Sequence, residues 1–83
     1  KNFSKLKLKI DRSNFNFDDI KNLFSYKSGR WDVEMYSGTL LKLPKDNIED
    51  SLNLSWKILN EDILGEIEVL DLRQTNQVVI NGT

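Results

Sequence analysis

The sequence predicts an α+β fold, in which an antiparallel β-sheet carries one or two helices on one face in the order α-β-β-α-β-β. Residues 30–36 and 39–43 alternate apolar and polar side chains around a glycine turn, which is typical of a β-hairpin. Residues 46–59 repeat apolar side chains at helical spacing, and residues 66–81 return to strand-forming side chains. A chain of 83 residues is expected to form one domain over 1–83.

The first 28 residues leave two conformations open. In residues 1–13, Leu6 and Ile10 fit either the alternation of a strand or one face of a helix. On a helix, the Lys and Arg residues of this segment would form a solvated basic face and not a binding patch. In residues 14–28, Asp18-Asp19 can start a short helix, and residues 20–26 can form a strand.

The strand register of the hairpin of residues 30–43 can be predicted from whether its loop has an odd or an even number of residues. Trp31 and Val33 lie on one strand face, with Leu41 and Leu43 on one face of the partner strand. A three-residue loop over 36–38 pairs Val33 with Leu41 and Trp31 with Leu43. The same register places Asp32 across from Lys42, an attractive cross-strand pair. Gly38 then takes the left-handed position of the loop.

A helix of about 14 residues is expected after Pro44, which ends the second strand. Asp46 and Glu49 have the spacing of a capping box at its start. Its apolar stripe consists of Ile48, Leu52, Trp56 and Leu59. Leu54 and Ile58 lie away from that stripe, which favours a helix buried on two sides and in contact with the first helix; the alternative is a patch exposed to a partner.

The C-terminal segment predicts two more strands. Apolar residues change phase between Val69 and Leu70, which indicates a β-bulge or burial on both faces. Thr75-Asn76 has turn chemistry. The last strand, residues 77–81, has no charge and no proline, so it lacks the usual protection of a sheet edge. It therefore either recruits another strand or lies covered inside the sheet.

Composition argues against several kinds of site. The chain has no Cys and no His, and its 12 basic residues nearly balance its 13 acidic ones. We therefore expect no enzyme, no metal site and no cofactor, since thiol and imidazole groups are missing together. The alternative function is a single-stranded nucleic-acid-binding module. It would use the basic and aromatic residues of the first third: Lys5, Lys7, Lys9, Arg12, Lys21, Lys27 and Arg30 with Phe15, Phe17, Phe24, Tyr26 and Trp31.

Three segments carry a resemblance to a known family. They are Arg30-Trp31-Asp32 with Gly38, then Leu41-Lys42-Leu43-Pro44, and Asp71-Leu72-Arg73. Over roughly residues 13–82, these resemble the membrane-distal periplasmic β domain of the bacterial cell-division family FtsQ (DivIB), in its alphaproteobacterial form. The resemblance implies a single-pass inner-membrane protein at the division septum. Its membrane helix and POTRA domain are expected upstream of this chain. The resemblance also favours a helix over residues 1–13, and a strand before Ser28-Gly29 that runs through a bend there into the next strand.

The resemblance also implies a function and a site. FtsQ β domains are non-catalytic divisome scaffolds that bind FtsB and FtsL, and FtsB adds a strand to the terminal strand. Carried over by position, the partner-binding residues are Arg30, Arg73, Gln74, Gln77, Val78, Val79, Ile80 and Asn81. Arg30 is expected on the strand next to the docking strand, where its basic side chain could meet an acidic partner. Alternate pockets near Val78 and Ile80 would give selectivity. An open edge of this kind also allows weak self-pairing.

Six further positions are expected to have structural roles: Trp31, Gly38, Leu43, Pro44, Trp56 and Asp71. Trp31 is expected to anchor the core, and Asp71 to stabilise a strand or turn. The chain departs from some family members at two places. It has Gln74 where they have an aromatic residue, and Gly82-Thr83 where they have a Trp. Partner contacts at these places are expected to differ.

Overall fold

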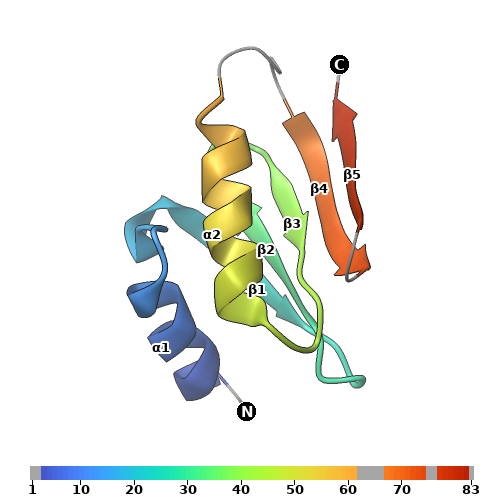
Figure 1. Ribbon diagram of the computed structural model, residues 1–83. Helices are drawn as coiled ribbons and strands as arrows, with labels where there is room; N and C mark the ends of the chain where they lie inside the picture. Colours follow the sequence, from blue (N-terminus) through green and yellow to red (C-terminus); the bar gives the residue numbers. More distant parts are fainter. Residues whose placement is uncertain (1–2, 62–66, 75–76, 83) are drawn as a thin grey trace.

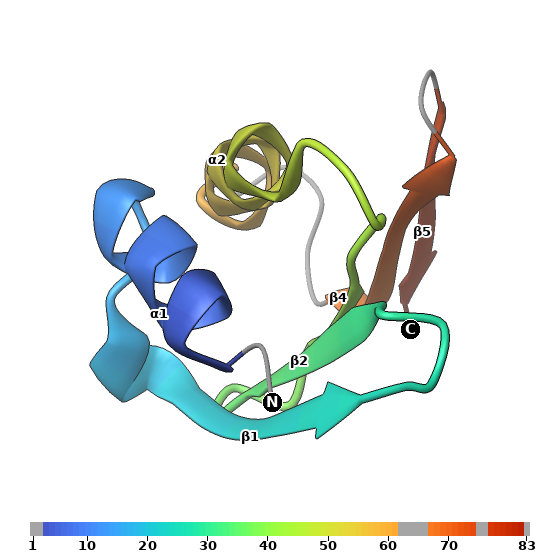
Figure 2. The ribbon, with the colours of Figure 1, turned by 90° about the horizontal axis from the view of Figure 1, so that it is seen from below.

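The computed structural model describes residues 3–61, 67–74 and 77–82. Its strands form one sheet in the order β1-β2-β3-β4-β5, and both helices lie on the same face of it (Figures 1 and 2). The fold is therefore α+β, as predicted. Its elements are α1 (Phe3–Arg12), the 3₁₀ turn η1 (Phe17–Asp19), β1 (Ile20–Ser25), β2 (Trp31–Met35), β3 (Leu40–Lys42), α2 (Ile48–Leu59), β4 (Ile67–Gln74) and β5 (Gln77–Gly82).

Two features of the sheet differ from the expected α-β-β-α-β-β antiparallel arrangement. Residues 14–28 form both open alternatives, the short helix η1 and the separate strand β1, so three strands precede α2. The chain does not bend through Ser28-Gly29 into the next strand; it reverses there, and β1 pairs antiparallel with β2. β3 and β4 pair in parallel, because α2 carries the chain back across the sheet between them.

The hairpin register predicted from parity is confirmed. Val33 pairs with Leu41 and Asp32 pairs with Lys42, and the Leu43 amide donates to the Trp31 carbonyl at 3.1 Å. The Met35 amide donates to the Thr39 carbonyl across the loop. Gly38 has φ +100°, the left-handed region that glycine adopts without steric cost.

Helix α2 is shorter than expected and begins differently. It has 12 residues, and its N-cap is Asn47 in a left-handed conformation without a side-chain cap, so the capping box of Asp46 and Glu49 is wrong. Leu52 and Ser55 are its buried residues. Trp56 is 41 % exposed, so it is not the buried member of the stripe that the sequence predicts. Ser55 is fully buried, and its hydroxyl donates to the Ser51 carbonyl at 2.8 Å.

The core lies between the sheet and the two helices. α1 is a helix, as preferred, and buries Leu6 and Ile10 on the sheet side. It packs beside α2, as predicted, where the Asn14 amide donates to Oδ1 of Asn53 at 2.8 Å. Ile58 of α2 packs against the core, but Leu54 is 42 % exposed, so the predicted burial of α2 on two sides is wrong at Leu54. The remaining buried apolar side chains are Phe15, Ile20, Trp31, Val33, Met35, Leu41, Leu43, Leu52, Ile67, Leu70 and Leu72.

The phase break in β4 is a β-bulge. Ile67 pairs with Gly82 and Val69 pairs with Asn81, so one extra residue of β4 lies between these pairs. The bulge moves burial from odd to even positions: Ile67 is buried before it, and Leu70 and Leu72 are buried after it. The predicted turn at Thr75-Asn76 lies outside the described residues.

Candidate functional site

Strand β5 forms an outer edge of the sheet, next to β4 alone among the described strands. Figure 1 shows that neither helix covers β5. Val79 and Ile80 are 40 % and 41 % exposed, and adjacent strand residues point to opposite faces. Val78 is half-buried and packs against the core. The edge strand therefore exposes apolar surface on both of its faces.

The other edge of the sheet is β1, and it is better protected. Its pairing with β2 shifts register between Ile20 and Asn22, and Lys21 within this irregularity is exposed. Bulges and lysines are two devices that discourage another strand from pairing at an edge. The described part of β5 offers neither charge nor proline, so β5 is the better site for strand pairing.

Three of the expected partner-binding residues line one groove at the end of β4. Arg30, Arg73 and Gln74 surround a space of about 410 Å³ between β4 and the start of α2. Lys45 adds a third positive charge, and Asp46 is the acidic residue in the lining. Arg30 was expected on the strand next to β5, but it directly precedes β2. It reaches the groove because the ends of β2 and β4 lie at the same end of the sheet.

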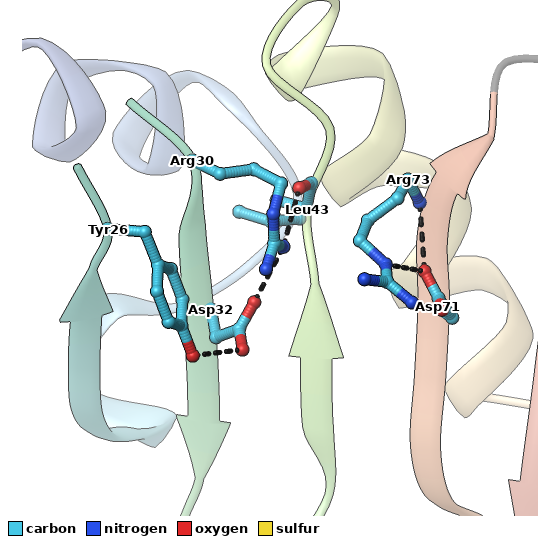
Figure 3. A network of polar contacts seen from close by, with 6 residues as sticks. All are labelled: Tyr26, Arg30, Asp32, Leu43, Asp71 and Arg73. Atoms are coloured by element: carbon cyan, nitrogen blue, oxygen red, sulfur yellow. Dashed lines mark hydrogen bonds and ion pairs between the residues drawn. The ribbon is translucent and has the colours of Figure 1, made fainter. Parts of the chain in front are cut away.

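Arg30 is held in place by a network of polar contacts (Figure 3). Its Nη1 donates to Oδ1 of Asp32 at 2.8 Å and to the Leu43 carbonyl at 3.2 Å. The Tyr26 hydroxyl donates to Oδ2 of Asp32 at 2.8 Å, and the Tyr26 ring lies 4.9 Å from the guanidinium carbon. This hydrogen bond to Asp32 raises the pKa of Tyr26. Arg30 is therefore oriented before any partner arrives.

A second pair of the same kind orients Arg73. Its Nε and Nη2 donate to the Asp71 carboxylate at 2.9 and 2.6 Å, and its backbone amide donates to Oδ1 of Asp71 at 3.1 Å. These bonds hold the pKa of Asp71 below, and that of Arg73 above, their ordinary values. Figure 3 shows the two arginine–aspartate pairs on either side of β3.

The two pairs belong to one row of residues across the open face of the sheet. Asp32, Lys42 and Asp71 are direct neighbours in the strand register. Phe24 on β1 continues the row past Asp32, and Val79 on β5 continues it past Asp71. The three central residues of the row are negative, positive and negative in turn, and the row ends in an exposed apolar side chain at each edge of the sheet.

The residues of the nucleic-acid alternative lie on several surfaces. Phe15 and Trp31 are buried, and Phe24 and Tyr26 lie on the open face of the sheet. The Tyr26 ring is already covered by Arg30. The basic residues of α1 lie in the helix layer on the opposite face (Figure 2). Basic and aromatic residues of the set therefore meet in separate pairs, Lys7 with Phe17 in the helix layer and Arg30 with Tyr26 on the open face, and not on one continuous surface.

The expected structural residues divide into two groups. Trp31 and Leu43 are buried in the core, and Pro44 is half-buried directly after β3. Trp56 was expected to be a buried structural residue, but it lines an exposed hollow with Phe15 and Met35.

Among the expected partner-binding residues, the side chains of Gln77 and Asn81 lie outside the described residues.

Sequence reasoning missed Asp32 and Tyr26 as the residues that orient Arg30. Alternation places Asp32 on the solvent side of its strand, yet it is 3 % exposed. A positive-φ glycine at Gly29 reverses the chain between Tyr26 and Arg30 and brings the two opposite each other. The signal was present in the spacing of tyrosine, glycine, arginine and aspartate around that turn.

Comparisons and searches for other sites give few further findings. No known family model and no curated sequence matches this chain. In residues 3–61, 67–74 and 77–82, no three His, Cys, Asp or Glu side chains gather where they could hold a metal ion. Neither described helix is long and apolar enough to cross a membrane.

Proposed function

We propose that this chain is a non-catalytic scaffold domain of the bacterial divisome, similar to the FtsQ β domain, that recruits FtsB and FtsL by strand addition at β5. The observation that carries the proposal is the position of β5 at an outer sheet edge without charge or proline. An edge strand of this kind presents unpaired N–H and C=O groups to an incoming strand. The proposed location is the periplasm, at the septum.

Exposed side chains on β5 would add selectivity to the backbone hydrogen bonds. An added strand would cover Val79 on the open face of the sheet and Ile80 on the helix side, and it would remove apolar surface from water on both faces. The groove lined by Arg30, Arg73 and Lys45 lies near the start of β5. It would suit an acidic side chain next to the partner strand, because its arginines are already oriented.

The test is a titration of the isotope-labelled chain with a peptide from the membrane-proximal periplasmic part of the cognate FtsB. We expect amide shifts and slower hydrogen exchange over residues 73–81, because strand addition gives the outer amides new acceptors. Changes confined to β1 would place the interface at the wrong edge. Changes at Phe24 and Tyr26 on addition of an oligonucleotide, with none from the peptide, would favour the nucleic-acid alternative.

Two proline variants separate strand addition from ordinary surface contact. Consecutive residues of a strand direct their N–H groups to opposite sides, so one of Val79→Pro and Ile80→Pro removes a donor from the outer edge and the other removes one facing β4. The variant that keeps its dispersed amide spectrum should lose peptide binding. If it still binds, strand addition at β5 is wrong. Lys57→Gln, on exposed α2 surface, is the control and should bind normally.

Self-pairing of the open edge would imitate the partner in a binding assay. Sedimentation of the chain at increasing concentration measures this directly, since self-pairing depends on concentration. The peptide titration is then carried out in the concentration range in which the chain sediments as a monomer.

A further inference from the structure

A small hollow on the other side of the molecule from β5 gathers three lysines. It lies between α1, the turn that precedes β2 and the start of α2, and it has a volume of about 170 Å³. Lys5, Lys9 and Lys45 line it, above a floor of Leu6, Trp31 and Ile48. We call this feature the lysine hollow. Figure 2 shows α1 and β5 at opposite ends of the sheet, so the hollow is separate from the proposed strand-addition edge.

The local structure fixes how the lysines converge. Lys5 and Lys9 are one helical turn apart on α1 and therefore share a face. Lys45 comes from the segment before α2, and its side chain runs past Gly29: a Cβ atom added there would lie 3.9 Å from Cε of Lys45. Two segments that are distant in sequence, α1 and the segment before α2, thus place lysines around one space.

The charged residues that line the hollow are all lysines. None of the residues that line it is acidic. The ion pairs found in the described part of the chain use Lys7, Arg30 and Arg73, and not the three lysines of the hollow. Like charges brought together over an apolar floor repel each other, and an anion bound between them would remove that repulsion.

We propose that the lysine hollow binds a phosphate group, either as the free anion or as part of a lipid headgroup. Each ammonium group offers three donors and no acceptor. A phosphate group offers several acceptor oxygens in a tetrahedral arrangement, which suits donors supplied by the two segments on either side of the hollow. A carboxylate has two coplanar oxygens and matches this arrangement less well. Lys45 also lines the groove proposed for an acidic side chain of the partner, whereas Lys5 and Lys9 do not, so variants of Lys5 and Lys9 test the hollow separately.

The test compares a double variant of the hollow with a charge-matched control. The isotope-labelled 83-residue chain is titrated with sodium phosphate, and separately with sodium chloride at equal ionic strength, because chloride measures simple screening. We expect phosphate-specific amide shifts at Gly29, Trp31 and Lys45. Lys5→Gln with Lys9→Gln should weaken phosphate binding roughly tenfold or more, since it removes two charge-assisted hydrogen bonds.

The control variant, Lys21→Gln with Lys57→Gln, removes the same charge from exposed positions on β1 and α2. It should change the phosphate affinity by less than about twofold, because isolated surface charges contribute little. Equal weakening in both double variants, or identical shifts from phosphate and chloride, would overturn the proposal. The hollow variants leave Arg30 and Arg73 intact, so they should still bind the FtsB peptide, and failure of one proposal does not affect the other.

A second arm identifies the source of the phosphate. The chain is mixed with vesicles of phosphatidylglycerol or of phosphatidylcholine, and bound protein is separated by flotation. Retention on phosphatidylglycerol that the hollow variant loses and the control keeps would identify a lipid headgroup. Phosphate shifts without vesicle retention would identify the free anion. Absence of both would overturn the proposal.

Discussion

Replacement of Asp32 by alanine should lower the free energy of unfolding by about 3 kcal/mol. Asp32 is 3 % exposed and accepts hydrogen bonds from Arg30 and Tyr26, each at 2.8 Å. Removing one member of a buried ion pair costs about 3–5 kcal/mol, because the remaining charge is left without its partner. The Arg30 side chain is 19 % exposed and keeps its bond to the Leu43 carbonyl, so we expect the lower end of that range.

A loss of this size is easily measured. A chain of this length is expected to have a total stability of about 4–12 kcal/mol, so Asp32→Ala removes a large part of it. In urea denaturation followed by tryptophan fluorescence, the midpoint should fall while the slope m stays constant. The melting temperature should fall by about 12–24 °C.

Glu34→Ala is the matched control for this prediction. Glu34 lies on the same strand and face, is half-buried and accepts one exposed hydrogen bond from Asn22 at 2.9 Å. Its replacement should change stability by less than about 0.5 kcal/mol. A loss of less than about 1 kcal/mol of unfolding free energy for Asp32→Ala, or a loss no greater than that of Glu34→Ala, would mean that the network around Arg30 does not stabilise the fold.

Three further predictions use the same assay. Gly38→Ala should lower the free energy of unfolding by about 1–2 kcal/mol, because φ is +100°. Gly38→Asn should lower it less, because Asn tolerates this backbone conformation better and no atom lies within 4 Å of an added Cβ. An equal or greater loss for Asn would point to crowding. Arg73 lowers the pKa of Asp71, so Asp71 stabilises the fold above the usual carboxyl pKa of about 3.9 and this contribution disappears as the pH falls through the lowered value. The stability difference between wild type and Asp71→Asn should therefore vanish in strong acid, and a constant difference would contradict this. Asp32 raises the pKa of Tyr26, so the contribution of Tyr26 is complete below its usual pKa of about 10 and is lost as the pH rises through the raised value. Tyr26→Phe should accordingly lose less stability in alkali than wild type, as a pH series of denaturation curves would show.

Local patterns predicted the parts of the fold that depend on neighbours in sequence. The register of Val33 with Leu41 followed from loop parity and from the need for Gly38 at a positive φ. The bulge in β4 followed from the phase change at Leu70. For the hairpin, the side-chain period of two allows one register that buries the apolar residues, so the pattern determines the result. For β4, the pattern left a bulge and burial on both faces open, and the strand register decided for the bulge.

Other predictions failed because they depended on how elements meet in space. A helical stripe indicates which residues share a face but not which member points at the sheet, so Ser55 is buried and Trp56 is exposed. The capping box at Asp46 was wrong because the turn from β3 places Asn47, in a left-handed conformation, at the helix start. Both outcomes depend on how α2 packs against the rest of the molecule and on how the chain leaves β3, which the helical pattern does not contain.

The sequence by itself determined the α+β class, the central hairpin and the absence of charge and proline from the last strand, because each depends on residues close together in the chain. Only the tertiary structure decided that β5 lies at an outer edge, that β3 and β4 pair in parallel, and that Arg30 and Arg73 line one groove. The lysine hollow, too, joins segments far apart in sequence. Such contacts arise from long-range packing, which selects one of several arrangements that the same local patterns permit.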